Sequence, residues 1–337
     1  MNGARAVALH ANSSGRTELS MNDAPRAFRM EILAKLGYAP EAIVPGRFIR
    51  FSTSQSRSDN AGWCKLFDDM CGGVFGCYRS GLSETWSVVD RAAMTRAQRI
   101  DLARQVMAAT VEREALQRQK WAENARRNSQ LWGECVPLAI HDPCHRYLTQ
   151  RGLGQELRFP PCLRLHQALP YWDAGEKLGP FPAMVASIVD PSGRLVALHR
   201  TYLTADGRKA NVPTPKKVTG ASGLMAGASI PLHEPTGGVI GIAEGIETAL
   251  ATHFASGIHT VAAYCAGNMA SYVWPQSVKR IVVFADADRA GVDAAQKLKI
   301  RAMQSGLSAV VLSPTTPGTD WCDVWMQRDT LTEEVSE

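Results

Sequence analysis

The sequence has no long apolar run, no closely paired cysteines and no phosphate-binding loop, and each absence excludes a class of protein. No segment approaches the roughly 20 apolar residues that a membrane-spanning helix needs. The eight cysteines contain no Cys-x-x-Cys pair, so they resemble neither a secreted disulfide framework nor a typical zinc site. A Gly-x-x-x-x-Gly-Lys-Ser/Thr segment is also missing, which excludes a P-loop from this sequence.

Residues 1–20 contain no apolar stretch of the kind found in signal peptides. We therefore expect a reduced, cytoplasmic protein that does not bind a membrane. The 337 residues are 45% hydrophobic and 20% charged, which suits globular cores and allows two or three domains. The net charge of +5 is compatible with a polyanionic partner, although many enzymes are equally basic.

Local composition divides the chain into six parts. Glycines recur between short alternating stretches in residues 46–86, which is typical of strands and tight turns. Residues 90–132 contain neither Gly nor Pro and favour one long helix or a helical pair. The predicted parts are a disordered tail at 1–24, a small β-rich module at 25–89, a helical linker at 90–134, a basic α+β subdomain at 135–236, an α/β domain at 237–328 and a tail at 329–337.

The C-terminal third alternates between strand and helix patterns. Predicted strands at 238–243, 259–263, 280–285 and 309–312 are separated by helical segments, which implies parallel pairing with right-handed crossovers. Upstream, residues 183–190 and 195–203 predict a hairpin around a Pro-Ser-Gly turn. The expected fold class is therefore α/β with a mostly parallel sheet and flanking helices, preceded by the α+β subdomain and the β-rich module.

Carboxylates follow three of the predicted parallel strands. These acids are Glu244, Asp286, Asp288, Asp320 and Asp323. Ligands of open α/β sheets bind at the carboxyl ends of the strands, so we expect the acids to meet at one edge. Clustered carboxylates repel one another and suit Mg²⁺ or Mn²⁺, which can promote phosphoryl transfer. Any single acid has a structural alternative: Asp288 precedes a helix and is a candidate N-cap.

Two of these acidic segments resemble the Toprim domain. Residues 244–248 (Glu-Gly-Ile-Glu-Thr) are similar to its opening acidic motif, and residues 286–291 (Asp-Ala-Asp-Arg-Ala-Gly) are similar to its Asp-x-Asp motif. The resemblance implies that Glu244 is a metal ligand or acid–base residue and that Asp286 and Asp288 are metal ligands. It also implies a trailing acidic pair at Asp320 and Asp323. Primases often have Asp where this chain has Thr248, and Glu247 is a candidate to replace it as a ligand.

The upstream block resembles the basic subdomain of bacterial replicative primases. Residues 145–153 are similar to their Tyr-Leu-x-x-Arg-Gly-Leu segment, and residues 193–200 resemble the strand that follows. The resemblance implies a basic wall that binds template and nucleotide, and the nearby cations could equally be solvent-exposed. The candidate residues for nucleic-acid or nucleotide binding are Arg200, Lys209, Lys216, Lys217 and Arg289.

Together, these resemblances predict a DNA primase of the phage, plasmid or mobile-element type. Such a nucleotidyltransferase would use nucleoside triphosphates and Mg²⁺ or Mn²⁺ to make short RNA primers on single-stranded DNA. Because this sequence has no P-loop, a replicative helicase would act in trans. Two alternatives are a metal-dependent Toprim nuclease and a non-catalytic accessory protein that binds single-stranded DNA.

The N-terminal module resembles a zinc ribbon in texture, but we do not expect zinc. Its cysteines Cys64, Cys71 and Cys77 lack paired ligand spacing, and the group formed by Cys135, His141, Cys144 and His145 overlaps the primase-like segment. Aromatic side chains of the module could stack on bases or, for most of them, pack in its core. These aromatic residues are Trp63, Phe67, Phe75, Tyr78 and Trp86.

Overall fold

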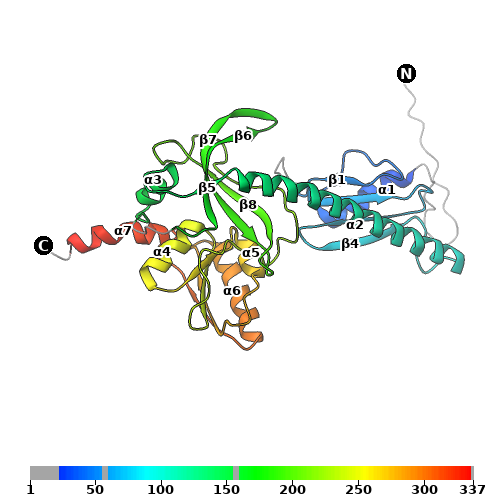
Figure 1. The fold of residues 1–337 in the computed structure, drawn as a ribbon. Coiled ribbons are helices and arrows are strands. Elements are labelled where there is room, and N and C mark those ends of the chain that lie inside the picture. The colour runs from blue at the N-terminus through cyan, green and yellow to red at the C-terminus, as the bar shows by residue number, and fades with distance from the viewer. Residues whose placement is uncertain (1–22, 55–59, 155–158, 335–337) are drawn as a thin grey trace, which may run out of the picture. The chain divides into compact units, whose positions relative to one another are not determined.

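The computed structural model describes residues 23–54, 60–154 and 159–334 (Figure 1). The tail predicted at 1–24 lies almost wholly outside the described residues, as do the last three residues of the C-terminal tail. The chain forms two compact units, Met1–Arg118 and Gln119–Glu337. The 38-residue helix α2 (Arg96–Gly133) contributes to both. Within the described segments, no helix is both apolar and long enough to span a bilayer.

The first unit is a four-stranded antiparallel sheet with a hydrophobic cluster on each face. On one face, Phe28 of α1 (Ala24–Leu36) contacts Phe75 with ring centroids 5.9 Å apart. On the other, Leu102 and Val106 of α2 pack beside Trp63. The strands, in sheet order, are β1 (Ile49–Phe51), β2 (Gly62–Leu66), β3 (Gly72–Cys77) and β4 (Leu82–Ser87).

The aromatic side chains of this module are used mainly in its core. Trp63, Phe67 and Phe75 are all at most 4% exposed, which leaves no free ring face for a nucleotide base. Tyr78 is 41% exposed, with the Arg50 guanidinium 4.4 Å from its ring centroid. Core packing, the alternative considered for most of these residues, therefore accounts for three of them.

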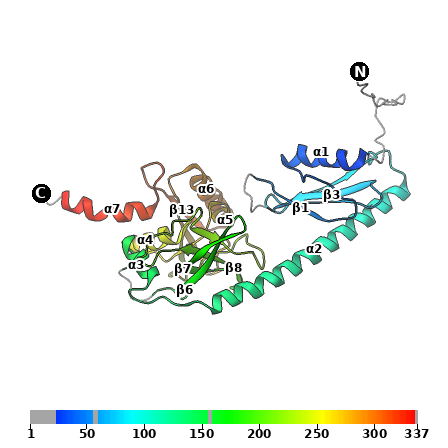
Figure 2. The same cartoon turned by 90° about the horizontal axis from the view of Figure 1, so that it is seen from above.

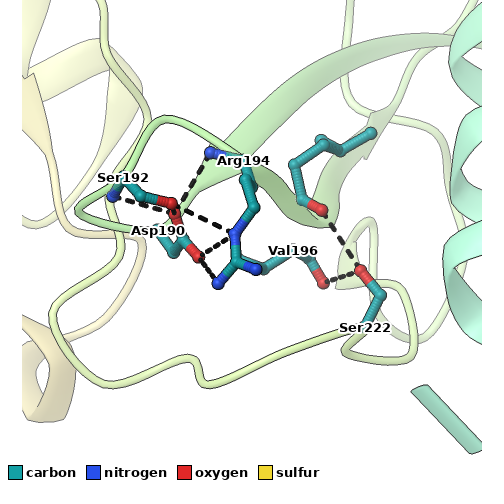
Figure 3. Close-up of polar contacts among 6 residues, drawn as sticks. Asp190, Ser192, Arg194, Val196 and Ser222 are labelled. Atoms are coloured by element: carbon teal, nitrogen blue, oxygen red, sulfur yellow. Dashed lines mark hydrogen bonds and ion pairs between the residues drawn. The ribbon is translucent and has the colours of Figure 1, made fainter. Parts of the chain in front are cut away.

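The second unit begins with a five-stranded antiparallel sheet. Its strands, in sheet order, are β5 (Val136–Pro137), β6 (Leu163–Asp173), β7 (Glu176–Val189), β8 (Leu195–Tyr202) and β9 (Lys216–Val218). The predicted hairpin is present as β7 and β8. Asp190 fixes its turn by accepting hydrogen bonds from the backbone N–H groups of Ser192 and Arg194 and from both side chains (Figure 3). Gly193 provides the left-handed backbone of this turn, with φ of 82°.

The C-terminal part of this unit is a four-stranded parallel sheet of order β11-β10-β12-β13, which confirms the predicted α/β class. Helices cover both faces. The strands are β10 (Val239–Ala243), β11 (Thr260–Ala262), β12 (Arg280–Phe284) and β13 (Ser308–Leu312). The helices are α4 (Ile246–Ser256), α5 (Ala266–Ser271), α6 (Arg289–Gln304) and α7 (Trp321–Glu334).

One hydrophobic core joins the two sheets of the second unit. Leu250 of α4 and Cys322 of α7 share it with Leu163 of β6 and Met184 of β7. Residues of α5 and α6 pack into a separate cluster that also includes Ile281 and Val283 of β12. Figure 2 shows α4 beside the short helix α3 (Pro143–Gln150), which belongs to the upstream block. The shared core fixes upstream residues against the carboxyl edge of the parallel sheet.

Candidate active site

The carboxyl edge of the parallel sheet opens into a cavity of about 210 Å³. Glu244 follows β10 and Asp286 follows β12, and Ala243 pairs with Phe284 at the end of these neighbouring strands. Asp320, in the loop between β13 and α7, is a third acid at this cavity. The charged lining residues are Glu244, Glu247, Asp286, Asp320, Arg151, Lys209 and Lys216.

Asp286 is the acid whose environment is most clearly unfavourable for a negative charge. Burial, followed by the charges of Glu244 and three aspartates, raises the pKa of Asp286 to about 7. Its Oδ1 atom is buried, and it accepts no hydrogen bond from the residues that the structure describes. A buried carboxylate oxygen without a donor is a position that a cation can stabilise.

Glu244 shares this environment. Burial and then the charge of Asp288 raise its pKa above the usual value, while the Ala266 N–H and Lys216 act in the opposite direction. The Ala266 N–H belongs to the first turn of α5, so the turn after β11 helps to hold Glu244 in place. Glu244 and Asp286 are thus hard oxygen donors with raised pKa values, and both fit the chemistry of a Mg²⁺ or Mn²⁺ site.

Three of the other predicted metal ligands form local caps. Asp288 Oδ1 accepts a hydrogen bond from the Gly291 N–H at 2.7 Å, as the N-cap of α6. Asp320 Oδ1 accepts from the N–H groups of Cys322 and Asp323, and Asp323 Oδ2 accepts from the Asp320 N–H. Across the described ranges, no three His, Cys, Asp or Glu side chains are already arranged to hold a metal ion. The role of Asp288, Asp320 and Asp323 as metal ligands stays a prediction.

Glu247 has a different environment from the other acids. It is 4% exposed, its Oε1 accepts a hydrogen bond from Tyr147 Oη at 2.5 Å, and its Oε2 pairs with Lys216 Nζ at 2.9 Å. Burial acts to raise the pKa of Glu247, but Lys216 and the hydrogen bonds lower it overall. Its predicted role as a metal ligand is untested, and both oxygens already have protein partners.

Lys209, Lys216 and Arg151 form the cationic side of the cavity. Burial, and then the charges of Lys216 and Arg151, lower the pKa of Lys209. Arg151 lies at the end of α3, in the segment that resembles the primase Arg-Gly-Leu sequence. A cavity lined by both cations and acids suits a ligand that carries phosphates together with metal ions.

The remaining predicted basic residues do not line this cavity. Arg200 donates to Tyr202 Oη and to the Val218 carbonyl, at 3.3 Å in both cases. Lys217 donates to the Trp172 carbonyl at 2.6 Å and lies 3.5 Å from an Asp173 carboxylate oxygen. The side chain of Arg289 is 96% exposed. The structure therefore places Lys209 and Lys216 in the cavity with the acids and places the other three outside its lining.

Sequence reasoning missed three lining residues: Arg151, His199 and Tyr264. His199 is 8% exposed, and its Nδ1 atom has no hydrogen-bond partner within the described chain. Burial, followed by Lys216, lowers the pKa of His199 to about 4, so the imidazole is neutral at pH 7. Arg151 had a signal, because it lies in the primase-like segment. His199 had the same kind of signal, since it lies in the primase-like stretch 193–200, whereas Tyr264 had none beyond its place two residues after β11.

The comparisons with known families identify the C-terminal region. Residues 239–330 match the family described as the Toprim domain, and residues 122–229 match a domain of unknown function, DUF7146. The chain therefore carries a Toprim domain, and the resemblance seen at Glu244 and at residues 286–291 is confirmed for this region. No curated protein matches the sequence.

The search of solved structures found primases at low identity. The catalytic domain of DnaG primase bound to single-stranded DNA is 15% identical, with 65% of this chain and 81% of that chain covered and a TM-score of 0.42. The DnaG catalytic core is 15% identical, with 65% and 79% covered and a TM-score of 0.41. The Aquifex aeolicus primase, comprising zinc-binding and RNA polymerase domains, is 14% identical, with 94% and 83% covered and a TM-score of 0.34.

Proposed function

We propose that this protein is a primase that joins nucleoside triphosphates into short RNA primers on single-stranded DNA. The observation that carries the proposal is the cavity, which Glu244 and Asp286 of the Toprim-like region line together with Lys209 and Lys216. Acids that can hold Mg²⁺ or Mn²⁺ and cations that can hold phosphates are the two requirements of phosphoryl transfer. One of the similar solved structures, the DnaG primase catalytic domain, is bound to single-stranded DNA, the template that we propose for this protein.

In this mechanism, each side of the cavity has its own task. Glu244 and Asp286 would hold a divalent ion, which supplies charge neutralisation at the triphosphate when bound. Lys209, Lys216 and Arg151 would orient the phosphates. The 3′-hydroxyl oxygen forms a bond to the α-phosphorus, the bond from that phosphorus to the bridging oxygen breaks, and pyrophosphate leaves. The hydroxyl proton passes to water or to a carboxylate of the cavity.

Two further expectations from the sequence belong to this proposal. A replicative helicase would be a separate partner, in the setting of a phage, plasmid or other mobile element. The protein would act in the cytoplasm.

One assay tests the proposed reaction. The protein is incubated with single-stranded DNA, labelled nucleoside triphosphates and Mg²⁺ or Mn²⁺. Extended labelled products that disappear in Asp286→Asn and persist in the control Lys297→Ala, an exposed lysine on α6, would support the primase. Shortened DNA would indicate a nuclease, and binding without new or shortened strands would indicate an accessory protein. Either result would overturn the proposal.

A further inference from the structure

We propose that Glu247 is a positioning residue that holds Lys216 in the cavity, and that it is not a metal ligand. The inference rests on the proposed function, because it assigns Lys216 to the phosphates of the substrate. Glu247 lies in the first turn of α4, three residues after Glu244. Its carboxylate nevertheless belongs to a different set of contacts from those of Glu244 and Asp286.

The contacts of Glu247 come from two segments of the upstream block. Tyr147 of α3 donates to one carboxylate oxygen, and Lys216 of β9 pairs with the other. Tyr147 is 3% exposed, so the phenol and the carboxylate are both withdrawn from water. A metal ion at Glu247 would have to compete with the ammonium group and the phenol for one buried carboxylate, and displacing the phenol would leave a buried hydroxyl unpaired at high cost.

Lys216 differs from Glu247 in being accessible to a ligand. Its side chain is 36% exposed and lines the cavity, whereas the Glu247 side chain is 5% exposed. A lysine is a point charge on a flexible four-carbon stem, so its position is poorly defined unless a partner fixes it. Glu247 supplies that partner from the rigid start of a helix, and the Tyr147 hydroxyl orients the carboxylate.

The negative charge of Glu247 also offsets part of the positive charge of Lys209, Lys216 and Arg151. Lys216 and Arg151 lie close enough to Lys209 to lower its pKa, after the larger effect of burial, and Glu247 is the acid that opposes them most strongly. Without Glu247, three cations would share the cavity wall, and Lys216 could turn toward Glu244 or Asp286, which line the same cavity. Glu247 therefore determines where the ammonium group lies, while its negative charge weakens the general attraction of the wall for anions.

These two effects predict a separation of kinetic constants in Glu247→Gln. The amide of Gln keeps the shape of the side chain but cannot form the ion pair, so Lys216 would lose its fixed position. We expect kcat to fall about 10²-fold, as for other small misplacements of a group that orients the substrate. The wall gains one net positive charge, so KM for ATP should stay the same or decrease. Mn²⁺ affinity, measured by isothermal titration, should remain within about threefold of the wild type, unlike that of Asp286→Asn. A residue needed only for folding would not produce this combination.

The decisive experiment is a double-mutant cycle on primer synthesis with Glu247→Gln, Lys216→Ala and the combined variant. If Glu247 acts through Lys216, the Gln substitution should change kcat less than about threefold once Lys216 is removed. Equal losses in both backgrounds, an unchanged kcat in Glu247→Gln, or a loss of Mn²⁺ affinity would each overturn the inference. Lys297→Ala again provides a lysine substitution outside the cavity.

Two additions keep the test decisive. If Glu247→Gln does not fold, Tyr147→Phe is used instead, because it removes one hydrogen bond to the same carboxylate and leaves the ion pair. In this variant kcat should fall about 2- to 10-fold. This loss should disappear in the Lys216→Ala background. If the wild type makes no primers, the proposed function fails, and the same cycle is measured on the Kd of ATP with Mn²⁺. Additive effects on that Kd, or no ATP binding by the wild type, would overturn the positioning role separately.

Discussion

At the scale of single residues, Asp286 combines an unpaired buried oxygen with several neighbouring acids. In the metal-free protein, these features favour the protonated carboxyl group. The folded-state pKa of about 7 lies above the ordinary value of 3.8, so the folded protein retains a proton that the unfolded chain releases. As pH rises from about 4 to about 7, the ionisation of Asp286 therefore reduces stability.

Asp286→Asn should remove this loss. The free energy of unfolding of the variant, relative to that of the wild type, should increase as the pH rises from 5 to 8, because the amide carries no charge. Primer synthesis should fall by orders of magnitude in the same variant, since a metal-binding oxygen is lost. Urea unfolding at both pH values, without metal ions, checks the first result. A wild-type-minus-variant difference that is independent of pH would contradict the described environment.

Two substitutions of Asp288 can distinguish its role as the N-cap of α6 from its proposed role as a metal ligand. Asn is as good an N-cap as Asp, so Asp288→Asn should leave thermal stability nearly unchanged, whereas Asp288→Ala should lose about 1 kcal/mol. If Asp288 also binds the metal ion, both variants should lose synthesis to a similar extent. Full activity in Asp288→Asn would show that this residue is only a cap. Unfolding curves and synthesis rates for the two variants provide the comparison.

Some of these residue roles could be predicted from the sequence, and others could not. Glu244 and Asp286 directly follow apolar strand patterns, so their place at one sheet edge follows from the alternation of strands and helices. The partners of Glu247 lie 100 and 31 residues away in the chain. No local pattern indicates such pairs, because they depend on how α3 and β9 pack against α4.

At the scale of elements, the last part of α2 is joined to the upstream sheet by two buried amides. Asn124 Nδ2 donates to the Ala221 carbonyl at 2.7 Å, and Asn128 Nδ2 donates to the Gly220 carbonyl at 3.0 Å. The Gly220 position is close-packed: an added Cβ would lie 2.7 Å from Asn124 Nδ2. These contacts fix the end of α2 through specific hydrogen bonds.

Asn128→Ala should therefore destabilise the protein by about 0.5–1.5 kcal/mol, because it removes the hydrogen bond that the buried Asn128 side chain donates to the Gly220 carbonyl. Gln130→Ala is the matched control: Gln130 is exposed and donates only to Glu134, at 2.9 Å. Its loss should remain within about 0.5 kcal/mol. Chemical denaturation of both variants tests this difference, and equal losses would mean that the Asn128 hydrogen bond does not stabilise the fold.

The success of prediction varied among elements for physical reasons. The parallel strands and the β7–β8 hairpin were predicted because their apolar runs end at clear turn residues. Strand β6 was missed; it contains Pro170, and its pairing with β7 shifts register at two places, so its alternation is interrupted. The structure has one continuous helix where the sequence allowed either one helix or two.

At the scale of the whole molecule, the net charge of +5 does not show which cations are available to DNA. Lys209 lines the cavity, while Lys217 is held by the Trp172 carbonyl, by Asp173 and by the Tyr171 ring 4.0 Å away. The sequence grouped both lysines as nucleic-acid-binding residues. Their surroundings instead indicate that Lys209 is accessible to phosphates and that Lys217 stabilises the β6–β7 hairpin.

The salt dependence of binding to single-stranded DNA should distinguish these two lysines. Lys209→Ala should reduce the slope of log affinity against log salt concentration by about 0.7, the value for one lost phosphate contact. Lys217→Ala should leave that slope unchanged and lower thermal stability instead. Fluorescence anisotropy at several salt concentrations provides the measurement. A reduced slope in Lys217→Ala alone would reverse the two assignments.

The buried carboxylate of Glu247 has a consequence for modularity. The Toprim match begins at residue 239, yet this carboxylate is ion-paired with Lys216 and accepts a hydrogen bond from Tyr147, and both residues lie before that boundary. A transplant of residues 239–330 into another protein would therefore carry an unpaired negative charge and leave apolar side chains such as Leu250 without their upstream neighbours. We therefore expect the smallest segment that can be transferred to another protein to include α3 and β9, so that both sheets are transferred together.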